Sequence, residues 1–298
     1  MLLTFLMLTA IFCTSGQSEN RFEKPIRLTN FRLANKLHNA ANPGEKNYLV
    51  SPYAIQLALS MLYLGTNLNS QTSKQIKAHG LDLGTNQLEG MKGFYMKSLI
   101  HSLTDDSPII HDQDDEYESD PTVLRARLFL AINKQYNVDP NYAAAIRRFS
   151  NNASSVIRDD FGKYGQHVIN TINERISNLT DNMIQNFLPP GSLNDDTVLS
   201  LINAIYLKAE WHQDAGLSRI WRKKAFRLEG GTTKYLLMFE GTVRAPYFED
   251  EKFQLIKLPM KGDDYRQFWM YIVLPKVEDG RNFLSPLKTF VKRMISSI

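Results

Sequence analysis

The amino-acid sequence predicts an α+β fold with several helices. Helical patterns dominate the early part of the chain and strand-like runs dominate the late part. Strands and helices do not alternate regularly, as they would in a doubly wound sheet. The composition is that of an ordinary globular chain of 298 residues, with 43% hydrophobic and 22% charged residues.

The first 16 residues have the pattern of a secretory signal peptide. Residues 2–12 are almost all apolar, and the small and polar residues that follow indicate cleavage near Gly16. No basic residue precedes the run, which leaves a buried terminal helix as the alternative. The only cysteine, Cys13, lies in this segment, so the mature chain would have no disulfide. We expect a secreted, extracellular protein.

Two helices are expected between residue 51 and about residue 80. Ser51 is placed as an N-cap, Pro52 fits the first helical position and Gly65 marks the end. Thr72 and Gln75 have the spacing of a capping box, which predicts that the second helix begins at Thr72.

The next part of the chain begins with an acidic segment. Eight acidic residues lie between Thr104 and Pro121. They indicate a solvated loop, because few apolar residues lie among them. A calcium-binding loop is the alternative, but the ordered ligand pattern of such a loop is missing. A strand is expected over residues 123–132, and a short helix follows Asp139-Pro140 and continues to Phe149.

The longest helical pattern runs from Val168 to Phe187 and stops before two prolines. Asn178 lies on its polar face and is expected to be exposed. Asn178 is the acceptor asparagine of one N-glycosylation sequon, and Asn152 is that of another. The predicted signal peptide gives weight to both sites.

Strand patterns dominate after residue 197. The run over residues 197–208 is almost continuously apolar, which is typical of a central strand covered on both faces. Asn203 is its polar exception and is expected to bond to neighbouring backbone or hydroxyl groups. A hairpin is expected from strands over residues 253–258 and 268–274.

No motif of a catalytic or metal site occurs in the sequence. The nucleophile elbow, the zinc-protease motif, the Walker A loop and the dinucleotide-binding glycine pattern are missing. The six histidines lack metal-ligand spacing. We therefore expect no enzyme, cofactor or metal, although a triad of distant residues would leave no such motif. A net charge of +4 and the lack of a long apolar run predict neither a nucleic-acid nor a membrane partner.

The densest basic segment surrounds Trp221 and Phe226. Basic side chains at this density bind sulfated polysaccharide by releasing counterions, and a merely solvated surface is the alternative. The candidate polyanion-binding residues are Arg219, Arg222, Lys223, Lys224 and Arg227.

Four segments, in the same order along the chain, resemble the serpin family. NYLVSPYAIQLALSMLYLG is similar to the family's second helix, and INERISNLTDNMIQNFLPPGSL to the helix that lies across the main sheet. LINAIYLKAEW resembles the third strand of the main sheet with its following tryptophan. FQLIKLPMKGDD and MYIVLPK resemble two strands of the second sheet. The resemblance extends from about Asn30 to Leu274.

The resemblance implies a multi-helix domain with large mixed sheets that inhibits serine proteases. In the family, a protease cuts an exposed reactive loop, which then inserts into the main sheet as an extra strand. Ser51 and Asn203 match the shutter, where this sheet opens, and Trp211 matches the breach, where insertion begins. Ordinary capping and buried polar roles are the alternative for the first two. Ala54 replaces the second serine of the shutter pattern.

The tail departs most from the family. Residues 277–298 resemble neither its small-residue hinge and reactive loop nor its closing strands. We therefore expect an incomplete serpin domain over residues 21–298, without a reactive-site bond, that does not inhibit proteases as it stands. Its exposed edges and apolar faces are expected to make it poorly soluble. The alternative is a non-inhibitory secreted protein that binds a partner or a glycosaminoglycan.

Overall fold

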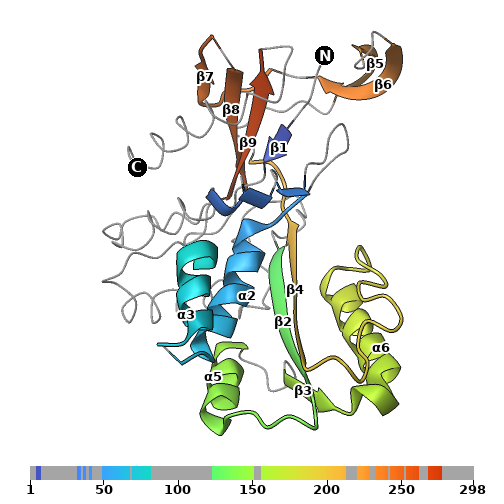
Figure 1. Cartoon of the computed structure of the whole chain (residues 1–298). Helices are drawn as coiled ribbons and strands as arrows, with labels where there is room; N and C mark the ends of the chain where they lie inside the picture. Colours follow the sequence, from blue (N-terminus) through green and yellow to red (C-terminus); the bar gives the residue numbers. More distant parts are fainter. Residues whose placement is uncertain are drawn as a thin grey trace, which may run out of the picture. The chain divides into compact units, whose positions relative to one another are not determined.

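A computed structural model describes much of the chain, and its named elements fall into two compact units (Figure 1). One unit holds the named helices and a three-stranded sheet, and the other holds the remaining strands. This arrangement confirms the α+β class. The acidic segment and the tail after residue 276 lie outside the described residues, which are 5–7, 32–34, 36–37, 40–41, 49–67, 69–81, 123–150, 156–212, 220–227, 232–240, 242–251, 253–261 and 268–276.

Helix α2 spans Pro52–Leu64, with the cap that the sequence predicts. The Ser51 hydroxyl oxygen accepts a hydrogen bond from the backbone N–H of Ala54 at 3.2 Å. Pro52 occupies the first helical position, where its missing N–H costs nothing. Gly65 closes the helix by donating its N–H to the carbonyl of Leu62.

Helix α3 spans Gln71–Gln75 and continues as a π-helical turn over Ile76–Leu81. The predicted start at Thr72 is wrong. Ser70 has the extended backbone that an N-cap needs, and its hydroxyl accepts a hydrogen bond from the N–H of Ser73 at 3.1 Å. Thr72 is therefore already inside the first turn.

Strands β2 (Val123–Asn133), β3 (Val156–Asp159) and β4 (Leu199–Lys208) form a sheet in the order β3-β2-β4. Strand β2 pairs parallel with β3 and antiparallel with β4. Helix α5 (Pro140–Ser150) connects β2 with β3. The predicted strands over residues 123–132 and 197–208 and the short helix are confirmed. Strand β4 lies at one end of this sheet, because among the described strands only β2 pairs with it.

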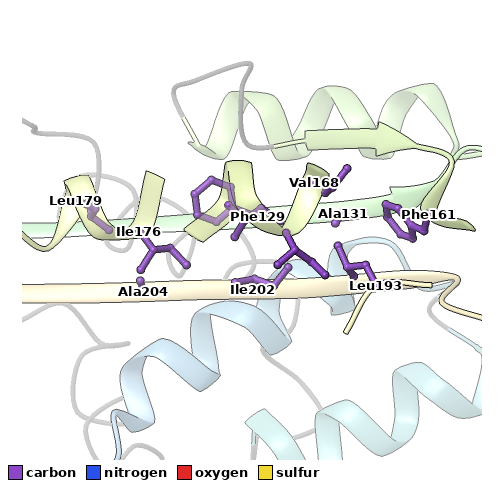
Figure 2. Packing of buried hydrophobic residues seen from close by; sticks show 11 residues of the cluster. Phe129, Ala131, Phe161, Val168, Ile176, Leu179, Leu193, Ile202 and Ala204 are labelled. Atoms are coloured by element: carbon purple, nitrogen blue, oxygen red, sulfur yellow. The ribbon is translucent and has the colours of Figure 1, made fainter. Parts of the chain in front are cut away.

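Helix α6 spans Phe161–Leu179 and covers one face of the sheet. Its N-cap is Asp160, which accepts a hydrogen bond from the N–H of Lys163 at 3.2 Å. Figure 2 shows the apolar side chains between helix and sheet. Burial of such a side chain contributes about 1.5–3 kcal/mol. The cluster consists of Phe129, Ala131, Phe161, Val168, Ile169, Ile172, Ile176, Leu179, Leu193, Ile202 and Ala204.

The opposite face of the sheet packs against α2. Side chains alternate along a strand, so the β2 residues that follow and precede those facing α6 point the other way. Leu128, Leu130 and Ile132 of β2 cluster with Met61 of α2, and Leu201 of β4 packs against them. Apolar packing on both faces of β4 is therefore confirmed.

The boundaries predicted for the long helix are wrong, because α6 both begins and ends earlier. The N–H of Asn182 donates to the carbonyl of Ser177 at 2.8 Å, and Asp181 and Asn182 have φ of 48° and 63°. These are the bond and the left-handed backbone of a helix C-terminus. Phe187, the end of the apolar pattern, is exposed. Periodicity alone therefore extended the helix too far.

The second unit contains a four-stranded antiparallel sheet in the order β1-β9-β8-β7. Its strands are β1 (Phe5–Met7), β7 (Tyr247–Glu249), β8 (Phe253–Met260) and β9 (Phe268–Pro275). The β8–β9 pair confirms the predicted hairpin. Strand β1 lies within the predicted signal peptide, whose cleavage stays a prediction.

The same unit holds an antiparallel two-stranded ribbon of β5 (Ile220–Arg227) and β6 (Thr233–Glu240). These two strands were not predicted from the sequence. Three consecutive basic residues in β5 interrupt the apolar alternation that marks a strand, although the aromatic and aliphatic residues of β6 carry a strand signal.

Candidate functional site

Ser51 and Asn203 converge on Ala54. The Ser51 hydroxyl accepts a hydrogen bond from the N–H of Ala54, and Asn203 Nδ2 donates one to the Ala54 carbonyl oxygen. Asn203 lies opposite Leu128 in the β2–β4 register, on the face of β4 that packs against α2. The expectation that Asn203 bonds to a neighbouring backbone group is confirmed. The bond fastens the middle of β4 to the first turn of α2.

Two buried polar side chains of α2 have no hydrogen-bond partner among the residues that the structure describes. Gln56 is fully buried with both amide atoms unbonded, and Ser60, one turn later, has an unbonded hydroxyl. An unbonded buried polar group costs about 1–3 kcal/mol. Sequence reasoning missed these residues, because polar side chains at helical spacing also fit an exposed stripe.

A carboxylate ties the C-terminal end of α6 to both β2 and β4. Arg125 Nη1 donates to Asp181 Oδ1 at 2.6 Å and to the carbonyl of Leu179 at 3.2 Å. The Tyr206 hydroxyl donates to Asp181 Oδ2 at 3.0 Å. Arg125 and Tyr206 lie directly opposite each other in the β2–β4 register. The Arg125 guanidinium carbon is 5.8 Å from the centre of the Tyr206 ring.

These bonds favour one protonation state. Hydrogen bonds from Arg125 and Tyr206 hold the pKa of Asp181 below its usual value. Desolvation, and then the bond to Asp181, raises the pKa of Tyr206. Asp181 therefore stays ionised and Tyr206 neutral at neutral pH. Sequence reasoning did not find this cluster, because its residues come from three separate segments.

Trp211, the predicted breach residue, belongs to a different unit from Ser51 and Asn203. It forms an isolated β-bridge with Met260 of β8 and is partly exposed. Next to this bridge, Glu210 and Lys261 form an ion pair with an N–O distance of 2.9 Å. The breach role stays a prediction.

The candidate polyanion residues divide between the two faces of the β5–β6 ribbon. Arg222, Lys223 and Lys224 are all exposed. Because neighbouring strand residues point to opposite faces, Arg222 and Lys224 share one face and Lys223 lies on the other. Lys234 of β6, opposite Phe226, is exposed on the face of Arg222 and Lys224. Arg219 lies outside the described residues, and Arg227 is the last residue of β5.

Of the two predicted glycosylation sites, the structure describes Asn178. It is exposed near the end of α6, as the sequence predicts. Asn152 lies outside the described residues.

Neither a metal cluster nor a membrane span is found in the described ranges. No three His, Cys, Asp or Glu side chains there are grouped so that they could hold a metal ion. No helix in the same ranges is long and apolar enough to cross a membrane.

Comparison with known proteins gives a consistent picture. Residues 28–297 match the family described as serpin (serine protease inhibitor). Serine protease inhibitor 42Dd of Drosophila melanogaster is 26% identical over 283 residues, which cover 94% of this chain and 65% of that protein. The chain thus spans less than two thirds of this curated relative, as it does of the next two, at 63% and 60%.

Two solved structures show the same fold. The native stressed conformation of Arabidopsis AtSerpin1 matches with a TM-score of 0.68 and 20% identity, over 94% of this chain and 66% of that one. Cleaved kallistatin in complex with heparin matches with a TM-score of 0.71 and 19% identity, over 93% of this chain and 76% of that one.

Proposed function

The chain belongs to the serpin family. We therefore propose that its residues form the strand-receiving sheet of a secreted inhibitor of serine proteases. Serpins are mostly protease inhibitors rather than enzymes, and we propose no catalytic role for this chain. The receiving sheet is β3-β2-β4, and the entering strand adds to the outer edge of β4.

The observation that supports this role is the environment of β4. Ile202 and Ala204 pack under α6, and Asn203 bonds to α2, so both faces are occupied. One edge pairs with β2, and no other described strand pairs with β4. A long, covered strand with one such edge can gain a complete ladder of hydrogen bonds when another strand joins it.

We further propose that these 298 residues, assayed alone, do not trap a protease. Residues 277–298 do not resemble the small-residue hinge and the reactive loop that serpins need to trap a protease. The test incubates the chain with trypsin-like and chymotrypsin-like proteases and examines the mixture by denaturing electrophoresis. We expect cleavage or no reaction. A covalent complex that survives the detergent would contradict the proposal.

Secretion and glycosylation are part of the proposal. The apolar run over residues 2–12 supports export, and the exposure of Asn178 supports its use as a glycan acceptor. The chain expressed in a eukaryotic secretory host should appear in the medium with an N-terminus near Gln17. Removal of N-glycans should shift its mass, and Asn178→Gln should reduce the shift. Retention in the cytosol would contradict both proposals.

Binding to a sulfated polysaccharide is a second candidate function, favoured by Arg222, Lys224 and Lys234 on one ribbon face. One similar structure is itself a heparin complex. The Arg222→Ala/Lys224→Ala double variant should elute from heparin at lower salt than Lys223→Ala/Arg222→Ala. Both pairs remove two cations, but only the first pair comes from a single face. If both double variants eluted at the same salt concentration, heparin binding would depend on total positive charge and not on one ribbon face.

A further inference from the structure

We propose that Asp181 is a positioning residue that holds the end of α6 against the sheet and thereby limits how fast the outer edge of β4 takes up an added strand. Its partners are Arg125 and Tyr206. The inference rests on the proposed role of β4 as the strand that receives another.

Asp181 is an unusual residue for its place in the backbone. Asp181 has φ 48°, a left-handed backbone in which glycine is the usual residue because a Cβ is crowded there. The turn is closed by a backbone bond from Asn182 to Ser177, which needs no side chain at position 181. The Asp181 carboxylate is thus unnecessary for the turn itself, and both of its oxygens bond to the sheet.

The contact made by Asp181 spans two strands of the sheet. Arg125 and Tyr206 face each other across the β2–β4 pair, and each bonds to a different oxygen of Asp181. The carboxylate therefore fixes α6 to both strands at once. The Arg125 and Asp181 side chains are 29% and 49% exposed, so water can replace these bonds and the contact can open and close.

The Asp181 cluster lies near the ends of both α6 and β4. Tyr206 lies near the C-terminal end of β4, which finishes at Lys208. Leu179 is the last buried residue of α6, and Asp181 follows it. The Asp181 cluster therefore lies at this end of the helix, just before Ile184, which packs against the same apolar cluster. We expect the bonds of Asp181, which are open to water, to break before the apolar contacts of α6 do.

The test compares Asp181→Asn with a matched control. Asn has the same size and tolerates the left-handed backbone, so Asp181→Asn removes the charge and one of the two acceptor oxygens while keeping the shape of the side chain. The control Lys134→Met removes the 3.1 Å ion pair with Asp160 at the other end of α6. All variants are studied as the full chain fused to a soluble carrier, to allow for poor solubility. Hydrogen exchange over residues 176–182 should become about fivefold faster in Asp181→Asn and change little in Lys134→Met.

A second measurement follows strand uptake. The probe is a fluorescent peptide of about 12 residues that alternates threonine and alanine. Its association should be about three- to tenfold faster with Asp181→Asn than with the parent chain, and unchanged with Lys134→Met. Tyr206→Phe, which removes only the phenolic hydroxyl, should have a smaller effect in the same direction.

The outcomes separate this inference from the proposed function. Unchanged exchange in Asp181→Asn would overturn the inference. Faster exchange with an unchanged peptide rate would also overturn it, while the role of β4 would stand. A peptide that binds neither the parent chain nor Asp181→Asn would refute the role of β4 itself. Exchange would still report whether Asp181 holds the end of α6.

Discussion

The sheet β3-β2-β4 and the ribbon β5–β6 are both made of paired strands, but they differ in what covers them. Helices pack on both faces of the sheet, and Ile172 and Ile176 of α6 are completely buried against it. On the ribbon, Trp221, Tyr235 and Leu237 are 59%, 67% and 67% exposed. Strand pairing is common to both regions, so covering helices make the difference. A ribbon of two strands without cover is marginal by itself.

The largest expected effect comes from opening the core beneath α6. Ile172→Ala removes apolar volume that is fully buried, so it should lower the free energy of unfolding by about 2–5 kcal/mol. Urea denaturation measures this loss. The matched truncation Tyr235→Ala on the ribbon should cost well under about 1 kcal/mol, because that side chain is largely exposed. Equal losses would mean that the two regions do not differ in coverage.

The next effect concerns the bond between β4 and α2. Asn203→Ala removes the side-chain bond to the Ala54 carbonyl of α2, so we expect a loss of about 0.5–1.5 kcal/mol in unfolding free energy. Ser51→Ala removes the cap of the same helix and should cost about 1 kcal/mol. Because both bonds involve Ala54, the losses should be non-additive in the double variant. Strict additivity in chemical denaturation would show that the two bonds are independent.

A smaller effect of opposite sign is expected inside the covered region. Gln56→Met keeps the length of the side chain and removes two unbonded buried polar atoms. The variant should be more stable by about 1 kcal/mol, a gain visible as a higher urea midpoint. Ser60→Ala should shift the midpoint in the same direction. A marked loss of stability in Gln56→Met would mean that the amide has a partner in solution.

The smallest effect is expected at the edge of the other sheet, where the Glu249 carboxylate of β7 accepts hydrogen bonds from several side chains. Hydrogen bonds from Lys276, Tyr247 and Gln254 lower the pKa of Glu249 from 4.5 to about 2. A lowered folded-state pKa gives stability above about pH 4.5 that is lost as the pH falls towards about 2. The parent chain should therefore exceed Glu249→Gln in stability at about pH 5, and the gap should shrink in acid. A gap that persists at low pH would contradict this assignment.

Local signals were sufficient where a feature depends on neighbouring residues. Ser51, Pro52 and Gly65 fixed both ends of α2, because capping and backbone preferences act within one turn. The apolar run of β4 showed that the strand is covered on both faces. Asn203 was expected to need a partner because a buried amide must be satisfied. Its partner, the Ala54 carbonyl, comes from a distant helix and could not be read from the sequence.

Tertiary structure decided the features that depend on distant segments. The apolar pattern of α6 continues beyond Leu179, but the left-handed turn at Asp181 ends the helix where Arg125 and Tyr206 can reach it. The amino-acid sequence by itself determined the family, the fold class and most element cores, since these follow from periodicity and local conformational preference. The end of α6, the partner of Asn203 and the division of the basic residues between two ribbon faces required the fold, because each depends on which strands and helices pack together.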